Sequence, residues 1–110
     1  MNNIMLNSKI INISSDDLGS QITFSESDND DCNYFLIQRF YGDYEEEDDD
    51  DSCYIESNIK NVTGHYSKVV KNLSEKSLEI KTEKFCIYIN FEIPELKYKK
   101  LKKVLNYIII

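Results

Sequence analysis

The stretch of sequence that decides the expected fold runs from residue 34 to residue 56 and reads YFLIQRFYGDYEEEDDDDSCYIE. It opens with an apolar run at residues 34–40, passes through an acidic block at residues 43–51, and ends with a second apolar piece at residues 53–56. Short runs rich in aromatic and β-branched residues favour strands, whereas a run of like charges repels itself and stays in solvent. The stretch therefore predicts a strand, an acidic loop and a second strand that pairs back on the first.

The first of these strands has apolar side chains on both faces. Phe35 and Ile37 point to one face, and Tyr34, Leu36 and Phe40 point to the other. Apolar residues at both odd and even positions are typical of a central strand that is covered on both sides. We therefore expect this strand to lie in the middle of a sheet, with at least partial cover over each face.

Alternating segments elsewhere predict further strands. A run of turn formers separates residues 4–13 from residues 21–25, so these two segments are expected to form an antiparallel hairpin. Residues 65–73 fit either a helical face or a strand, and their valines and tyrosine favour the strand. Residues 78–81 and 86–91 predict a second hairpin.

The last segment predicts an amphipathic helix of about four turns. Pro94 suits its first position, and apolar residues recur at the spacing of one helical face: Leu101, Val104, Leu105 and Ile108. This apolar stripe needs cover. We therefore expect an α+β fold, a mainly antiparallel sheet of about six to seven strands with the C-terminal helix packed on it, in a single domain over residues 1–110. The apolar chain end, residues 107–110, is expected either to dock on the protein or to join a dimer contact.

Composition and charge limit the classes of function. The chain has 110 residues and is 41% hydrophobic, which suits one folded domain. Residues 1–57 carry 15 acidic and 2 basic residues, whereas residues 58–110 carry 5 acidic residues and 11 lysines. This asymmetry argues against nucleic acid as a partner of the first half and favours a basic protein. Arg39 is the only arginine, and we expect it to pair with a neighbouring carboxylate.

The sequence offers little for catalysis. Cys32, Cys53 and Cys86 have no CxxC spacing and His65 is the only histidine, so neither a zinc site nor a catalytic triad is expected. No nucleotide-binding motif is present. We therefore expect no enzymatic activity, no cofactor, and free thiols in a reducing cytoplasm. Because the N-terminus is unlike a signal peptide and no segment is long and apolar enough to span a bilayer, a cytoplasmic protein without membrane contact is expected.

The acidic block has three interpretations: a solvated loop, a calcium site, or a surface that recognises a basic partner. Its spacing lacks the glycine and the alternating acidic positions of an EF-hand, which makes calcium the weakest of the three. Clustered carboxylates would speed association with a basic partner and help to exclude wrong ones. The candidate partner-binding residues are Asp43, Tyr44, Glu45, Glu46, Glu47, Asp48, Asp49, Asp50 and Asp51.

Several short segments of the chain occur in an order that can be compared with known families. They are YFLIQR at residues 34–39, CYIE at residues 53–56 after the acidic insertion, GHY at residues 64–66, LSEKSL at residues 73–78 and IYINF at residues 87–91, followed by the closing helix. This order resembles the immunity proteins of bacterial polymorphic-toxin systems, specifically the immunity protein 10 family.

The resemblance implies a small α+β protein that binds a cognate secreted toxin inside the producing cell and blocks it, with no catalytic residues of its own. The acidic first half adds the expectation of a basic toxin, such as a nuclease with a phosphate-binding surface. The alternative is a small acidic interaction or regulatory module that self-associates as a homodimer through its apolar C-terminus.

Overall fold

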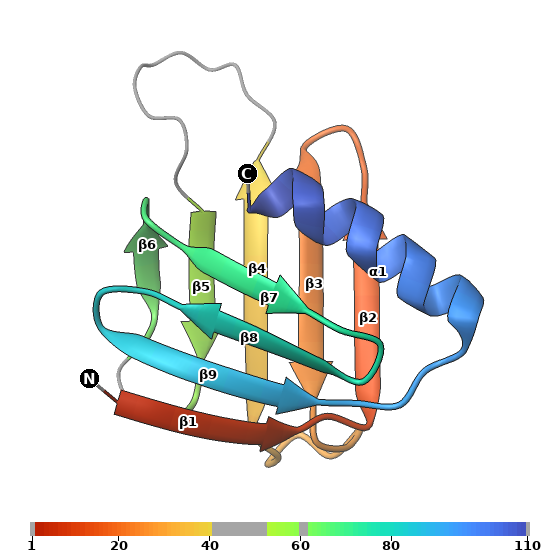
Figure 1. Ribbon diagram of the computed structural model, residues 1–110, viewed down its shortest axis with the longest axis horizontal. Helices are drawn as coiled ribbons and strands as arrows, with labels where there is room; N and C mark the ends of the chain where they lie inside the picture. The colour runs from red at the N-terminus through yellow and green to blue at the C-terminus, as the bar shows by residue number, and fades with distance from the viewer. Residues whose placement is uncertain (1, 41–52, 60–61, 110) are drawn as a thin grey trace.

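The computed structural model describes residues 2–40, 53–59 and 62–109 of the chain. Within these ranges the protein has nine strands, arranged in two sheets, and one helix (Figure 1). The predicted α+β class is confirmed.

The larger sheet has five antiparallel strands that follow one another in chain order. They are β2 (Ile10–Ser15), β3 (Gly19–Ser25), β4 (Tyr34–Phe40), β5 (Cys53–Ser57) and β6 (Gly64–Tyr66). The smaller sheet has the order β1 (Asn2–Asn7), β9 (Phe85–Asn90), β8 (Ser77–Lys81) and β7 (Val70–Leu73). Here β1 runs parallel to β9, and the other two pairs are antiparallel.

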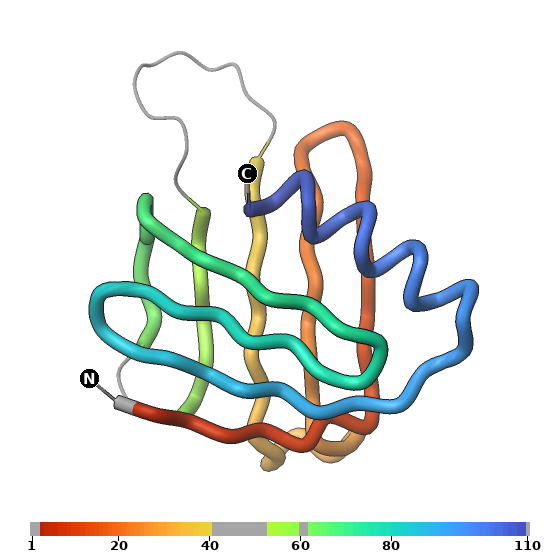
Figure 2. Tube along the Cα trace, viewed as in Figure 1, coloured from red at the N-terminus to blue at the C-terminus, as the bar shows by residue number. Residues whose placement is uncertain are grey.

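The two sheets form two layers. The four-stranded sheet and the helix α1 (Glu95–Ile108) lie next to each other over one face of the five-stranded sheet (Figure 1). The helix contacts β2, β3 and β4. The chain trace in Figure 2 shows the strands of the smaller sheet crossing those of the larger sheet at a steep angle. The core therefore fills one side of the larger sheet.

Alternate residues of the strands build this core. Phe35 on β4 is fully buried, and its ring centroid lies 6.5 Å from that of Phe24 on β3 and 6.3 Å from that of Phe85 on β9. Aromatic pairs at these separations add specific ring contacts to the burial of apolar surface. Phe35 thus joins the two layers at the centre of the molecule.

Several local predictions are confirmed. The segments β2 and β3, β4 and β5, and β8 and β9 each pair antiparallel as expected. The predicted apolar face of the helix, Leu101, Val104, Leu105 and Ile108, is buried, and the helix begins one residue later than predicted, at Glu95 with Pro94 as its N-cap.

The expected single sheet of about six to seven strands is corrected to two sheets with nine strands in the described ranges. Residues 4–13 are not one strand, because the chain turns at Ser8, whose buried hydroxyl donates to the carbonyl oxygens of Ile10 (3.0 Å) and Ser25 (3.2 Å). Residues 65–73 likewise divide between β6 and β7, one in each sheet. At both places the chain passes from one layer to the other.

The chain end docks on the protein's own core. Ile108 and Ile109 are buried, which confirms the docked alternative for these two residues. The carbonyl oxygen of Ile108 accepts a hydrogen bond of 2.9 Å from Nε of Arg39, and that of Ile109 accepts one of 3.0 Å from Nζ of Lys71. Arg39, expected to pair with a carboxylate, thus contacts the end of the helix.

In the described ranges, no helix has the length and apolarity needed to cross a bilayer.

Candidate functional site

The predicted binding residues of the acidic block, residues 43–51, lie outside the described residues. In the chain this block connects β4 to β5, the second and third of the three inner strands of the larger sheet. The calcium, solvation and recognition hypotheses for it therefore stay predictions.

The expectation that β4 is a central strand is confirmed, since it is the middle strand of the larger sheet, and the cover expected on both of its faces is only partial on one of them. Its inward residues are buried, but Tyr34 and Leu36 are only half-buried and Phe40 is 63% exposed. The helix and the smaller sheet lie on the opposite side, which faces the viewer in Figure 1. No described element packs over this second side of the sheet, so its apolar and aromatic residues face solvent.

We call this solvent-facing side of the five-stranded sheet the outer face. Because the strand register pairs Leu36 with Glu56 and Gln38 with Tyr54, alternate side chains of neighbouring strands meet there in rows. The central residues of the outer face are Asn12, Ser14, Gln21, Thr23, Tyr34, Leu36, Gln38, Tyr54, Glu56 and His65. It is a mostly neutral surface that mixes aromatic and amide side chains.

Glu56 is the centre of a hydrogen-bonded cluster on the outer face. The hydroxyl of Tyr34 donates to its Oε2 at 2.6 Å, and the hydroxyl of Tyr54 donates to its Oε1 at 3.0 Å. The backbone N–H of Tyr34 also donates to Oδ1 of Asn58, 3.0 Å away. The carboxylate is therefore held in place by groups from two adjacent strands.

His65 extends the cluster to the edge of the sheet. It is exposed and lies on β6, directly opposite Tyr54. The two rings have centroids 5.2 Å apart and planes inclined by 53°. An aromatic pair of this kind helps to hold the ring of Tyr54 from the neighbouring strand.

The cluster changes the acidity of its tyrosines. The hydrogen bond to Glu56, followed by burial and the nearby negative charge, raises the pKa of Tyr34 from 10.0 to about 12. The same hydrogen bond is the largest cause that raises the pKa of Tyr54. Both hydroxyls therefore remain protonated donors at neutral pH.

Replacing Glu56 by glutamine is expected to lower the pKa of Tyr34 from about 12 toward 10.0, because it removes the hydrogen bond to a carboxylate, which is the largest cause of the shift, together with the negative charge. The ring resonances of the tyrosines, followed by NMR as pH rises, measure this change. The substitution Glu79→Gln, in the other sheet, is the control and should leave Tyr34 unchanged. An unchanged pKa of Tyr34 in Glu56→Gln would contradict the observed geometry.

The same shift links the cluster to stability. Because the pKa of Tyr34 is higher in the folded protein than its ordinary value of 10.0, the stabilisation it supplies is complete below pH 10 and is lost as pH rises through about 12. The wild-type protein therefore loses more stability over this alkaline interval than Glu56→Gln does.

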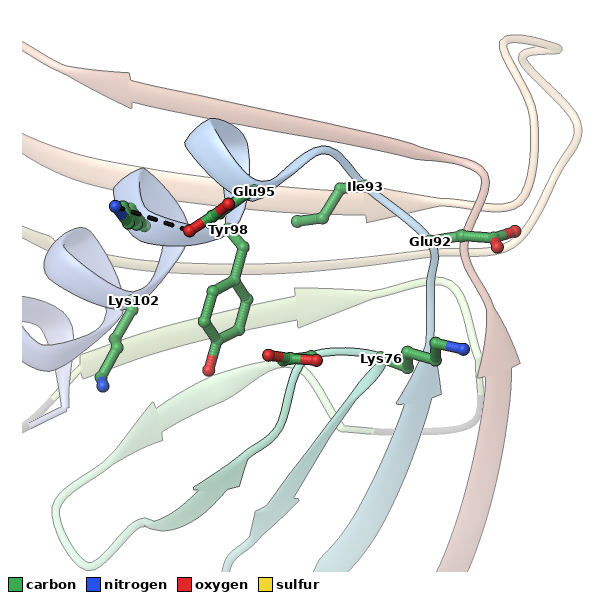
Figure 3. A pocket seen from close by; sticks show the side chains of 8 residues that line it. Lys76, Glu92, Ile93, Glu95, Tyr98 and Lys102 are labelled. Carbon is green, nitrogen blue, oxygen red and sulfur yellow. Dashed lines mark ion pairs between the residues drawn. The ribbon is translucent and has the colours of Figure 1, made fainter.

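A groove lies beside the helix N-terminus. It lies between the first turns of α1, the segment before them and the turn between β7 and β8, and Tyr98 extends across it from the helix (Figure 3). Its charged residues are three glutamates and three lysines, namely Glu75, Glu92, Glu95, Lys76, Lys99 and Lys102. All six are exposed and their charges balance, so the groove selects no ligand of one sign.

The cysteines behave as free thiols, as expected. Cys53 and Cys86 are buried and Cys32 is half-buried. Burial raises the pKa of Cys53 to about 11, which keeps this thiol protonated and a poor nucleophile at neutral pH. Among the described residues, no group of three or more histidine, cysteine, aspartate or glutamate side chains is placed to hold a metal ion.

Sequence reasoning missed the Tyr34–Glu56–Tyr54 cluster, although part of its signal was present. Tyr54 and Glu56 are two residues apart on an expected strand, and this spacing places them on one face. The link to Tyr34 required the register of β4 against β5, which the sequence pattern did not supply.

Comparison with the models of known protein families gave no match, and comparison with curated proteins also gave none.

Proposed function

We propose that this chain is an immunity protein that binds a cognate bacterial toxin and blocks it, and that the outer face of the five-stranded sheet is its binding surface. The observation that carries the proposal is the uncovered outer face, with half-buried Leu36 beside the ordered cluster of Tyr34, Tyr54 and Glu56. The order of sequence segments that resembles immunity protein 10 supplies the class of partner.

The composition of the outer face suits a protein partner. Tyrosine offers a large, rigid contact area and a polar hydroxyl, so it is enriched at protein interfaces. Gln38 lies opposite Tyr54, and Gln21 and Thr23 lie on the next strand, so neutral hydrogen-bonding groups adjoin the cluster on the side of β3. Such a surface of aromatic, amide and hydroxyl side chains suits binding by shape and hydrogen bonding.

The charge of the chain favours a basic toxin. The acidic block of residues 43–51 follows directly after β4, the strand that carries Tyr34 and Leu36. Carboxylates near a binding surface increase the association rate with a positively charged protein. A nuclease whose phosphate-binding surface is covered in the complex is the toxin class that this charge fits best.

A protection experiment tests the proposal. The toxin domain encoded next to this chain is expressed in a bacterial host, and co-expression of the chain is expected to restore growth. Leu36→Arg is expected to remove protection, because it places a large charged side chain at the centre of the outer face. Val70→Arg, at an exposed position of the smaller sheet, is the matched control and should protect fully.

Each outcome of this experiment decides one part of the proposal. Failure of the wild-type chain to protect would contradict the immunity function. Full protection by Leu36→Arg would keep the function but show that the toxin binds elsewhere, with the acidic block as the next surface to test.

The alternative is a homodimer formed through the apolar C-terminus. Ile108 and Ile109 are buried within the same chain, whereas Tyr107 is 41% exposed. The buried isoleucines are used in the core of their own chain and offer no surface to a second copy. Light scattering of the wild-type chain should therefore report a monomer.

A further inference from the structure

We infer that the Tyr34–Glu56–Tyr54 cluster is a receptor for one arginine side chain of the protein partner. This inference rests on the proposed function and deepens it, because it names the group that the outer face recognises. The occupant is a guanidinium, bound to the carboxylate of Glu56 and stacked on the tyrosine rings beside it.

The carboxylate of Glu56 has acceptor capacity left over. Each of its oxygens offers about two acceptor positions, and one on each is used, by Tyr34 at Oε2 and by Tyr54 at Oε1. Among the described residues, one position therefore remains on each oxygen. Two parallel N–H groups of a guanidinium match a carboxylate with one open position on each oxygen.

The surroundings of Glu56 leave its charge unmatched within the sheet. The outward positions of β2 to β6 in the described ranges carry no lysine and no arginine, and Glu56 is their only carboxylate. The residue opposite it on β4 is Leu36. A single fixed negative charge in a neutral, aromatic setting is complementary to a single positive group of a partner.

Arginine fits the cluster better than lysine. The planar guanidinium forms two hydrogen bonds to one carboxylate and stacks on aromatic rings, and it is more weakly hydrated than an ammonium group. The two tyrosine hydroxyls and the ring of His65 already hold the receptor in position. Binding therefore requires little further ordering of the side chains, which favours affinity.

The test uses the whole chain and blocked five-residue peptides with a central arginine, lysine or citrulline between glycines. Citrulline has the shape of arginine without its charge. We expect the arginine peptide to shift the NMR ring resonances of Tyr34 and Tyr54 saturably in the millimolar range. The citrulline peptide should bind at least about 10-fold more weakly, and the lysine peptide several-fold more weakly.

Two variants make the test specific. Glu56→Gln keeps the size of the side chain but replaces one of the two acceptor oxygens and removes the charge, and it should abolish the preference for arginine over citrulline. Glu79→Gln removes a carboxylate from the outward surface of the smaller sheet and should leave that preference intact. Equal binding of arginine and citrulline, no saturable shift with any peptide, or an undiminished preference in Glu56→Gln would each overturn the inference.

The failure of this inference differs from the failure of the proposed function. If the arginine peptide does not bind but the chain still protects against the toxin, the immunity function stands and the arginine receptor is wrong. If the peptide binds as expected but the chain gives no protection, the receptor stands and the immunity function is wrong.

Discussion

Replacing Phe35 by alanine is expected to lower the free energy of unfolding by about 3–5 kcal/mol. The side chain is fully buried, and its ring lies between Phe24 of the same sheet and Phe85 of the other layer. Removing it takes away apolar surface that is buried on folding, and it leaves a cavity that two sheets cannot close without moving relative to each other. Urea unfolding followed by circular dichroism measures the loss.

Phe40, at the other end of β4, provides the matched control. It is the same residue type on the same strand, but it is 63% exposed on the outer side. Phe40→Ala should therefore change the free energy of unfolding by less than about 0.5 kcal/mol. Similar losses for the two variants would contradict the assignment of an inner and an outer face to β4.

The parts of the fold that depend on local pattern were predicted well. Two-residue alternation and turn formers are properties of neighbouring residues, so the hairpin of β2 and β3 could be read directly. The division of the strands into two sheets could not be predicted from local pattern. It depends on the parallel pairing of β1 with β9, which joins Asn2 to Phe85 across most of the chain, and no local pattern specifies such a partner.

The outer face shows the same limit for the site. Tyr34 and Leu36 were interpreted as residues of a covered strand, because apolar side chains at both odd and even positions of a strand usually indicate burial on both faces. The sequence could not show that the helix and the smaller sheet would share one side of the larger sheet. That arrangement leaves Tyr34 half-buried beside Glu56 on the outer face, where a tyrosine is useful for binding as well as for packing.

Replacing Arg39 by methionine is expected to lower the free energy of unfolding by about 1.5–3 kcal/mol, the range for hydrogen bonds that involve a charged group. The last turn of α1 contains no basic residue, although the carbonyl groups at a helix C-terminus carry partial negative charge and lack partners within the helix. Arg39 on β4 donates to the carbonyl of Ile108. Amide hydrogen exchange should therefore accelerate most in the last turn of the helix.

The control is Lys99→Met, which removes a cation that lies on α1 itself. Its ion pair with Glu95 spans 3.6 Å between side chains that are 68% and 81% exposed, so its contribution should stay below about 0.5 kcal/mol. Lys71→Met should act in the same direction as Arg39→Met, because Lys71 donates to the carbonyl of Ile109 from the smaller sheet. If Arg39→Met and Lys99→Met had equal effects, the helix end would not depend on the cations of the two sheets, and its docking would rest on Ile108 and Ile109 alone.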